Sequence, residues 1–194
     1  MTRRGLLYAT LATALLLGGC AQLSIVASGE QVLKNRLAVQ VDQPWNQFER
    51  GLGDNTLTWT QDGITVDALR FYVAVKDGDL IAPTPSEPKG QKPLAFKSTM
   101  PAAEVVSLFE GLYSRGGSTF ALDRISPDTF GGRPGFRFEF SGIRKADDVR
   151  LRGIGWAAVH QGELFAITYT APRLAFFTRH LGSAEAIARS ARIR

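Results

Sequence analysis

Apolar and polar side chains alternate in several short runs of the chain, which is the pattern of strands with one buried face. Residues 36–41 show the alternation first, and residues 136–140 show it most cleanly. In the second run, three phenylalanines occupy one side, and Arg137 and Glu139 occupy the other. We expect both runs to form strands.

Two further regions have the pattern of hairpins. Residues 55–75 contain two strand-like runs joined at Asp62-Gly63, a pair of residues that favours the tight turns of hairpins. Residues 152–160 and 163–171 are also strand-like, and only a Gln-Gly pair separates them. Each region therefore predicts two antiparallel neighbours.

Two segments have the spacing of amphipathic helices, with apolar residues three and four positions apart. Residues 99–117 present one such face, made of Val105, Leu108, Phe109 and Leu112. We expect Thr99 to cap this helix and Gly116-Gly117 to end it. The C-terminal segment repeats the spacing at Leu174, Phe177, Leu181, Ala184, Ile187, Ala188 and Ala191. A bend or restart is expected there at Gly182-Ser183.

Hairpins with one helix inserted and one at the end predict an α+β fold, in which helices pack on a twisted, mainly antiparallel sheet. Residues 82–93 contain four prolines and predict a long loop, because proline lacks the backbone donor that a ladder needs. The alternative is a boundary between domains, but the segment before the loop is too short for a core of its own. We therefore expect one globular domain over residues 36–194.

The first twenty residues have the layout of a secretory signal peptide. Arg3 and Arg4 precede an apolar run over residues 6–17, which is shorter than the about 20 apolar residues that cross a bilayer. Leu17-Gly18-Gly19-Cys20 follows and resembles the bacterial lipobox. This resemblance implies that Cys20 is lipidated and that residues 1–19 are removed. The alternatives are a buried N-terminal helix and an uncleaved membrane anchor.

Lipidation at Cys20 would hold the mature protein on a membrane, since stable anchoring takes two acyl chains or more. Ala21, and not Asp, follows the cysteine. By resemblance to lipoprotein sorting, this favours the outer membrane, with the protein facing the periplasm. Residues 20–35 are expected to be the lipidated N-terminus and a tether. Cys20 is the only cysteine, so the domain can have no disulfide, thiolate metal site or cysteine nucleophile.

Four stretches of the mature chain resemble the PsbP-like group. They are residues 44–46, residues 62–78, residues 130–140, and residues 169–172 with a helix ending at 187–193. The group is an α/β/α sandwich named after a photosystem II extrinsic subunit, and it includes small bacterial lipoproteins. The chain is also similar to uncharacterised proteobacterial lipoproteins. The resemblance implies a fold used mainly for binding and assembly, and fold alone does not decide function.

No residue pattern in the chain indicates catalysis or a cofactor. His160 and His180 are the only histidines, and neither belongs to a metal-binding motif. No G-x-S-x-G motif occurs. The glycine-rich residues 131–135 precede a strand, whereas a phosphate loop precedes a helix, so they predict a tight turn. We expect no cofactor and no enzymatic activity.

A basic stretch offers the best candidate for a binding surface. We expect Arg150 and Arg152 to share a strand face, and Arg137 to lie opposite the phenylalanine stripe. If their strands are neighbours, these arginines form an outward patch for anionic lipid, lipopolysaccharide or an envelope protein. The alternative is an ordinary solvated strand face. Trp45, beside a proline at an expected turn, is a further candidate contact, although tryptophans in such segments are more often core.

The net charge of +5, which falls to +3 without Arg3 and Arg4, is too small to indicate nucleic acid. The sequence therefore predicts a lipid-anchored periplasmic binding or assembly module without catalytic activity. Its partners would be the membrane, through Cys20, and an envelope protein or an anionic envelope component. The alternatives are an envelope accessory that binds a small ligand between sheet and helices, or an enzyme whose site the sequence does not reveal.

Overall fold

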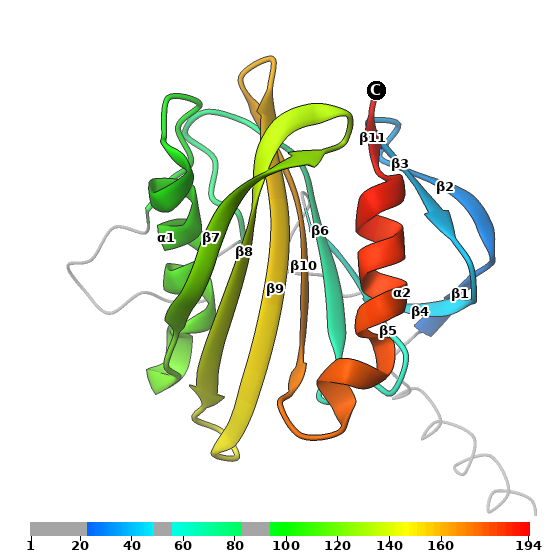
Figure 1. Cartoon of the computed structure of the whole chain (residues 1–194), viewed down its shortest axis with the longest axis vertical. Coiled ribbons are helices and arrows are strands. Elements are labelled where there is room, and N and C mark those ends of the chain that lie inside the picture. The colour runs from blue at the N-terminus through cyan, green and yellow to red at the C-terminus, as the bar shows by residue number, and fades with distance from the viewer. Residues whose placement is uncertain (1–22, 49–55, 83–93) are drawn as a thin grey trace, which may run out of the picture.

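The computed structural model describes residues 23–48, 56–82 and 94–194 (Figure 1). The predicted signal peptide and Cys20 lie outside these residues, as does nearly all of the proline-rich segment 82–93. Among the described residues, no helix is long and apolar enough to cross a membrane.

The centre of the molecule is an eight-stranded sheet in which all neighbours are antiparallel. Its strands, in spatial order, are β1 (Leu23–Val26), β4 (Trp45–Phe48), β5 (Thr56–Thr60), β6 (Ala68–Val75), β10 (Glu163–Pro172), β9 (Val149–His160), β8 (Arg133–Arg144) and β7 (Ala121–Phe130). A smaller antiparallel sheet has the order β11 (Arg192–Ile193), β3 (Leu37–Val41) and β2 (Gly29–Leu33).

The helices cover opposite faces of the large sheet, as Figure 1 shows. Helix α1 (Ala102–Tyr113) lies on one face and is followed by a short 3-10 turn, η1 (Arg115–Gly117). Helix α2 (Phe176–Ser190) lies on the other face, together with the small sheet. The predicted α+β class, with helices packed on a mainly antiparallel sheet, is confirmed.

Each face of the sheet has its own apolar core. On the α2 face, Trp45, Trp59 and Phe71 pack with residues of α2 such as Phe177 and Ile187. Residues of the small sheet complete this core. The large sheet is therefore covered on this face by the strands of the small sheet as well as by α2. Burial on both faces explains why β6 and β10 are almost continuously apolar.

The predicted phenylalanine stripe forms the core on the α1 face. Phe136, Phe138 and Phe140 all point to that side, where the apolar face of α1 packs on them. Phe138 lies opposite Gly155 on β9, and Phe140 lies opposite Gly153. A Cβ at either glycine would clash with the facing ring. The glycines therefore let the rings lie flat on the sheet beneath α1.

The prediction of a tether over residues 20–35 is wrong for its described part. Strand β1 pairs with β4 in the large sheet, and β2 pairs with β3 in the small sheet. Val26 and Leu33 are buried in the α2-face core. Both strands are short and half apolar, so the sequence alone did not separate them from a loosely packed leader. The domain therefore includes Leu23, and not only residues from 36 onward.

Two helix details also differ from the prediction. Thr99 is not the cap of α1, because Pro101 holds the N-cap position and no side chain caps it. Helix α2 is continuous through Gly182-Ser183, where a bend was expected. A single glycine costs an α-helix only about 1 kcal/mol, and the packing of Phe177, Ala184 and Ile187 on the sheet outweighs that cost.

Candidate functional site

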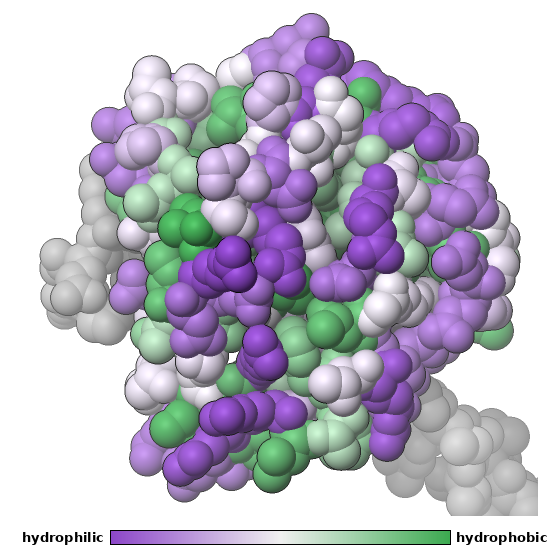
Figure 2. Space-filling view, in the orientation of Figure 1, coloured by the Kyte–Doolittle hydropathy of each residue, from purple (hydrophilic) through white to green (hydrophobic). Residues whose placement is uncertain are grey.

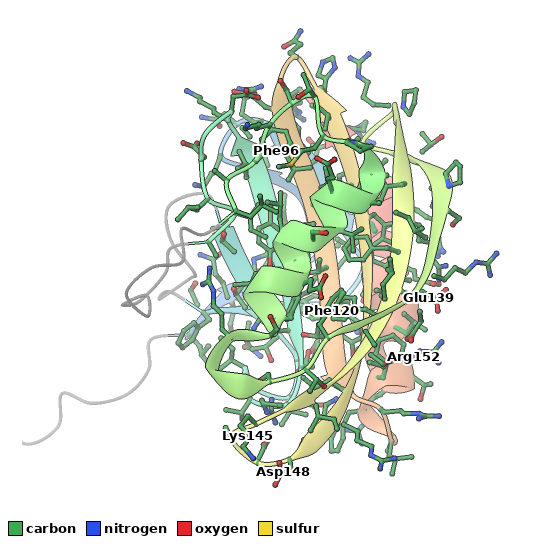
Figure 3. The ribbon with its side chains drawn as sticks, turned by 90° about the vertical axis from the view of Figure 1, so that its left-hand side faces the viewer. Phe96, Phe120, Glu139, Lys145, Asp148 and Arg152 are labelled. Carbon is green, nitrogen blue, oxygen red and sulfur yellow. The ribbon has the colours of Figure 1, made fainter. Side chains whose placement is uncertain are left out.

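A pocket of about 170 Å³ opens on the α1 face of the large sheet, beside the C-terminal end of α1. Its floor comes from β6, β9 and β10, and its rim comes from the ends of α1 and β8 and from the turns next to them. Figure 3 looks onto this face and shows α1 crossing it, with Phe120 beside the helix. The walls contain apolar residues from several elements: Ile64, Leu112, Phe140, Ile143 and Leu151.

Arg70 is one of the two arginines that line this pocket. It is the third residue of β6, where its neighbours along the strand are apolar, and it is half-buried. Its Nη1 donates to Thr170 Oγ1 at 3.3 Å and lies 3.5 Å from the hydroxyl of Tyr113, and its guanidinium lies 5.7 Å from the centre of the Tyr113 ring. No carboxylate among the described residues pairs with Arg70. A guanidinium in such a place keeps its charge, because arginine does not deprotonate in proteins.

Hydroxyl groups flank Arg70 on both neighbouring strands. Thr58 on β5 and Thr168 on β10 lie directly across from Arg70 in the register, so the three side chains share the α1 face. The hydroxyl of Tyr113 lies 2.8 Å from that of Thr168. Arg70 and these hydroxyl groups therefore form a small polar island inside an apolar face, and Arg70 and Tyr113 are its members that line the pocket.

Two buried polar atoms of this island, Arg70 Nε and Thr58 Oγ1, have no hydrogen-bond partner in the described structure. Buried polar groups in folded proteins nearly always have a partner. Burial also raises the pKa of Tyr72 well above its usual value, so its hydroxyl stays protonated at neutral pH. The island thus retains hydrogen-bonding capacity around a cation.

The carboxylate of Asp67, which lines the pocket, has hydrogen-bond partners other than Arg70. Asp67 lines the pocket, but its carboxylate accepts hydrogen bonds from the Thr60 hydroxyl and from the backbone N–H groups of Gln61 and Asp62. These bonds fix the turn between β5 and β6, where the Asp62-Gly63 pair was predicted to lie. The carboxylate therefore does not neutralise Arg70.

A second arginine closes the rim. Arg144 donates two hydrogen bonds to Asp147, at 2.9 and 2.7 Å, and a third to the carbonyl oxygen of Thr65. The hydrogen bonds from Arg144 lower the pKa of Asp147. Arg144 thus joins the β8–β9 turn to the β5–β6 connection, and its charge is balanced by its neighbour. The two arginines of the pocket differ in this respect, since only Arg70 lacks a carboxylate.

The predicted arginine surface lies on the opposite face of the sheet. Arg137 and Arg152 both donate to Glu139, at 2.7 and 3.1 Å, and Arg137 also lies 3.8 Å from Glu185 on α2. Figure 3 shows Glu139 and Arg152 side by side. The guanidinium of Arg152 also lies 5.3 Å from the centre of the Phe177 ring. Strands β8 and β9 are neighbours, so Arg137 and Arg152 lie close together, but Glu139 and Glu185 largely balance their charge.

Burial alone would raise the pKa of Glu139, but the hydrogen bonds from Arg137 and Arg152 outweigh it and keep that pKa below its usual value. Arg150 is exposed, and its side chain makes no ion pair with any described residue. Figure 2 shows polar and apolar residues interspersed over this side of the molecule. The surface is therefore a mixed polar face and not a strongly basic patch.

Trp45 is not a surface contact, and that prediction is wrong. Only 1% of the residue is exposed, because the expected turn is in fact strand β4, paired with β1 and β5. Its ring meets the edge of His180 in the α2-face core, with ring centres 6.3 Å apart.

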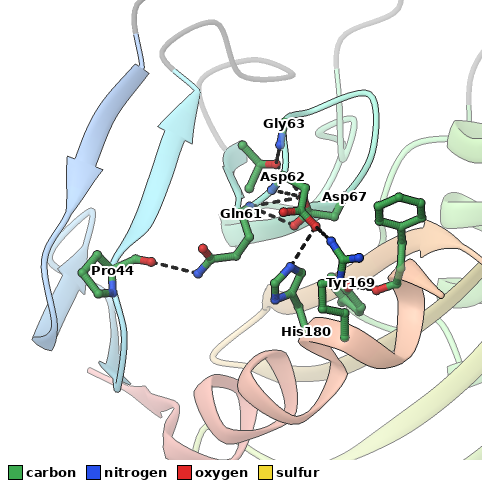
Figure 4. Close-up of polar contacts among 10 residues, drawn as sticks. Pro44, Gln61, Asp62, Gly63, Asp67, Tyr169 and His180 are labelled. Carbon is green, nitrogen blue, oxygen red and sulfur yellow. Dashed lines mark hydrogen bonds and ion pairs between the residues drawn. The ribbon is translucent and has the colours of Figure 1, made fainter.

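His180 belongs to a second polar cluster, shown in Figure 4. Its Nε2 lies 3.0 Å from Asp62 Oδ2, and Arg179 donates to the same oxygen. The hydrogen bond with His180 is the main cause of a lowered pKa at Asp62. This cluster ties α2 to the turn between β5 and β6. His160 lies at the end of β9, beside the predicted Gln-Gly turn.

No group of three or more histidine, cysteine or acidic side chains in the described structure is placed to hold a metal ion. The glycine-rich residues 131–135 include the tight turn between β7 and β8, as predicted, with Gly131 and Gly132 at positive φ. The carbonyl of Gly131 accepts a hydrogen bond from the backbone of Ile193, so this turn is fixed against β11.

One feature of the sequence, a lone arginine in an apolar run, indicates the pocket, although the hydrophobic periodicity alone does not reveal it. Residues 68–75 form an apolar run, as expected of a strand covered on both faces, and Arg70 is its only charged member. A lone arginine in such a run is costly to bury and therefore marks a place with a special environment. Which hydroxyls surround it depends on the pairing of β5, β6 and β10.

Comparison with known proteins shows the fold. No protein-family model and no curated protein matches the chain. Among solved structures, cyanobacterial PsbP (CyanoP) from Synechocystis sp. PCC 6803 has a TM-score of 0.57 and 12% identity, covering 92% of this chain and 99% of that one. At this identity the likeness concerns the fold alone, which is PsbP-like, as the resemblance implied.

Two other structures were compared. A crystal structure from Bacteroides thetaiotaomicron VPI-5482 has a TM-score of 0.51 and 9% identity over 87% of this chain, which spans about half (49%) of that longer one. LpqN, described as involved in cell envelope biogenesis of Mycobacterium tuberculosis, covers 91% of this chain at 14% identity, and 87% of LpqN is matched. Its TM-score of 0.33 is too low to support an argument.

Proposed function

We propose that this chain is a lipid-anchored binding module of the bacterial cell envelope, without catalytic activity, and that its α1-face pocket holds a small ligand with an anionic group. The observation that carries this proposal is Arg70, a half-buried guanidinium in a pocket with no carboxylate partner among the described residues. Guanidinium groups bind carboxylates and phosphates through charge-assisted, often paired, hydrogen bonds.

The rest of the pocket supports the same class of ligand. Hydroxyl groups of Tyr113 and Thr170 stand beside the guanidinium and can donate to an anion as well. Leu112, Phe140 and Leu151 provide apolar walls for a short hydrocarbon portion. A carboxylate or phosphate monoester with a small apolar body matches this arrangement of charge, hydroxyls and apolar surface.

The envelope location is supported by the sequence around Cys20. The order of basic residues, apolar run, small residues and cysteine matches a lipoprotein signal peptide, and Ala21 favours the outer membrane with the domain in the periplasm. The PsbP-like fold supports a binding or assembly role. As a second partner we propose an envelope protein or an anionic envelope component on the face of Arg150 and Arg152, where Glu139 reduces the net positive charge.

Thermal unfolding in the presence of simple anions tests the pocket. Butanoate and inorganic phosphate are titrated at constant ionic strength, with 1-butanol as the neutral probe. We expect at least one anion to raise the Tm saturably, because a ligand that binds only the folded state stabilises it. The Arg70→Gln variant should lose this rise. The Arg144→Gln variant is the matched control, since its arginine lies at the same pocket but is already paired with Asp147.

The outcome separates a site from a general salt effect. A Tm rise that is lost only in Arg70→Gln supports the proposal. Equal rises in the wild type and both variants, or no rise with any anion, would contradict an anion site at Arg70. A rise with 1-butanol alone would indicate an apolar ligand in place of an anionic one.

A further inference from the structure

Strand β1 exposes apolar side chains at one edge of the large sheet. Leu23 is 50% exposed and Ile25 is 77% exposed, although both belong to a regular strand. They alternate with Val26, which is buried on the other side in the α2-face core. Leu23 and Ile25 therefore point away from that core, and no other described element covers them.

The covalent chain places this strand next to the proposed lipid anchor. Only Ala21 and Gln22 separate Cys20 from Leu23. Even in a fully extended chain, three residues span at most about 11 Å. The headgroup region of each leaflet is roughly 5–8 Å thick, so an acylated Cys20 leaves β1 at the membrane surface whatever path the short connection takes.

We infer that the exposed face of β1, formed by Leu23 and Ile25, inserts into the interface of the membrane that carries the lipid anchor and fixes the orientation of the domain. This inference rests on the proposed lipidation of Cys20. Exposed apolar side chains gain stability by entering the boundary between headgroups and acyl chains. A tether too short to let the domain move away makes this contact effectively intramolecular.

The order of strands in the large sheet then predicts how far each part of the domain lies from the membrane. Strand β10, at the pocket floor, is four strands away from β1, or about 19 Å at the usual strand spacing. Strand β7, at the opposite edge, is seven strands away, or about 34 Å. With β1 on the membrane, the pocket opens into the aqueous compartment and β7 is the most distant strand.

Fluorescent labelling of the lipidated full chain tests this orientation. Because lipidation consumes the thiol of Cys20, a newly introduced cysteine is the only reactive one. The Ile25→Cys variant is labelled with the environment-sensitive dye NBD and reconstituted in phosphatidylethanolamine–phosphatidylglycerol vesicles, with and without nitroxide-labelled lipid. Ile125→Cys is the matched control, since Ile125 is an exposed isoleucine (37%) on the opposite edge strand.

We expect a blue-shifted NBD emission at position 25, strongly quenched by the nitroxide lipid, and an aqueous, unquenched emission at position 125. Aqueous emission at both positions would overturn the inference and leave the anchor intact. A blue shift at position 25 that is not quenched by lipid, and that grows with protein density, would assign β1 to a second copy of the chain and overturn the inference as well.

The wild-type chain distinguishes a failure of the anchor itself. If purified wild-type protein takes up the dye, Cys20 carries a free thiol, and both the proposed anchoring and the membrane contact of β1 are wrong. If it takes up no dye, the result at position 25 decides the inference alone.

Discussion

At the scale of single residues, the molecule holds one arginine in an unusual place. Several arginines form ion pairs with carboxylates. Arg144 pairs with Asp147, and Arg152 pairs with Glu139. Among the described residues, the hydrogen-bond partners of Arg70 are hydroxyl groups, and the ring of Tyr113 lies beside its guanidinium. Moving a charge out of water without an opposite charge is costly, so Arg70 is a feature that the fold retains at a cost in stability.

Replacing Arg70 with an apolar residue of similar length should therefore not destabilise the protein. We expect Arg70→Met to keep or increase the free energy of unfolding, by up to about 1–2 kcal/mol, while abolishing the anion-dependent rise in Tm. Urea unfolding followed by circular dichroism measures the first effect. A clear loss of stability would show that the hydroxyl contacts already compensate the guanidinium, and would weaken the case for an anionic ligand.

Glu139 predicts a pH dependence whose sign follows from its two arginine partners. Its pKa lies below the usual value of 4.5 in the folded state, so its stabilising contribution is complete above the unfolded-state pKa. That contribution is lost as the pH falls through the lowered folded-state pKa. We expect Glu139→Gln to cost about 1 kcal/mol at pH 7, because the pairs are partly exposed.

Urea unfolding of the wild type and Glu139→Gln at pH 7, 5 and 3 tests this expectation. The difference between the two proteins should shrink from pH 5 to pH 3. Asp128→Asn is a suitable control, since Asp128 makes no ion pair with a described residue. A difference that is constant over this range would mean that Glu139 acts through packing and not through its charge.

At the scale of elements, the α1 face depends on the match between two strands. Phenylalanines on β8 lie over glycines on β9, so that aromatic rings cover the positions without a side chain. The alternating pattern of residues 136–140 predicted the stripe. The register with Gly153 and Gly155 is a property of the pairing, and it decides which substitutions the sheet tolerates.

Two glycine substitutions should therefore have opposite effects. Gly155→Ala places a methyl group against the ring of Phe138 and should cost about 1–3 kcal/mol through overpacking. Gly182→Ala lies within α2, where a Cβ meets nothing within 4 Å, and should stabilise by up to about 1 kcal/mol through helix propensity. Thermal unfolding of both variants measures the difference. Equal effects would contradict the observed packing.

At the scale of the whole molecule, the two proposed contacts fall on different parts of the sheet. Strand β1, which follows the proposed anchor in the chain, lies at one edge of the sheet, and the pocket opens over strands nearer the other edge. A sheet covered by helices on opposite faces keeps these two regions apart without a second domain.

The anchor itself is tested by changing Cys20, which lies outside the described residues. Without the thiol, no diacylglyceryl group can be attached, so Cys20→Ser should abolish incorporation of radiolabelled palmitate. The protein should also accumulate as a precursor or leave the membrane fraction. Ala21→Ser is the matched control and should be labelled normally. Normal labelling of Cys20→Ser would contradict the lipoprotein assignment.

Local patterns in the sequence were enough for much of the architecture. Alternation over residues 136–140 and the turn pairs at Asp62-Gly63 and Gln161-Gly162 predicted strands and hairpins that the structure contains. Helical spacing predicted α1 and α2. These signals are local, because a turn or an amphipathic face depends on residues only a few positions apart. The resemblance of residues 17–20 to a lipobox is local in the same sense.

Features that depend on distant residues came only from the tertiary structure. Strand β1 forms by pairing with β4, and β2 forms by pairing with β3. Trp45 is buried because α2 covers it. The polar surroundings of Arg70 depend on the pairing of β6 with β5 and β10. The sequence by itself determined most of the longer elements and the class of fold. The pairing of strands far apart in the chain decided which arginines are balanced by carboxylates and which side chains surround Arg70.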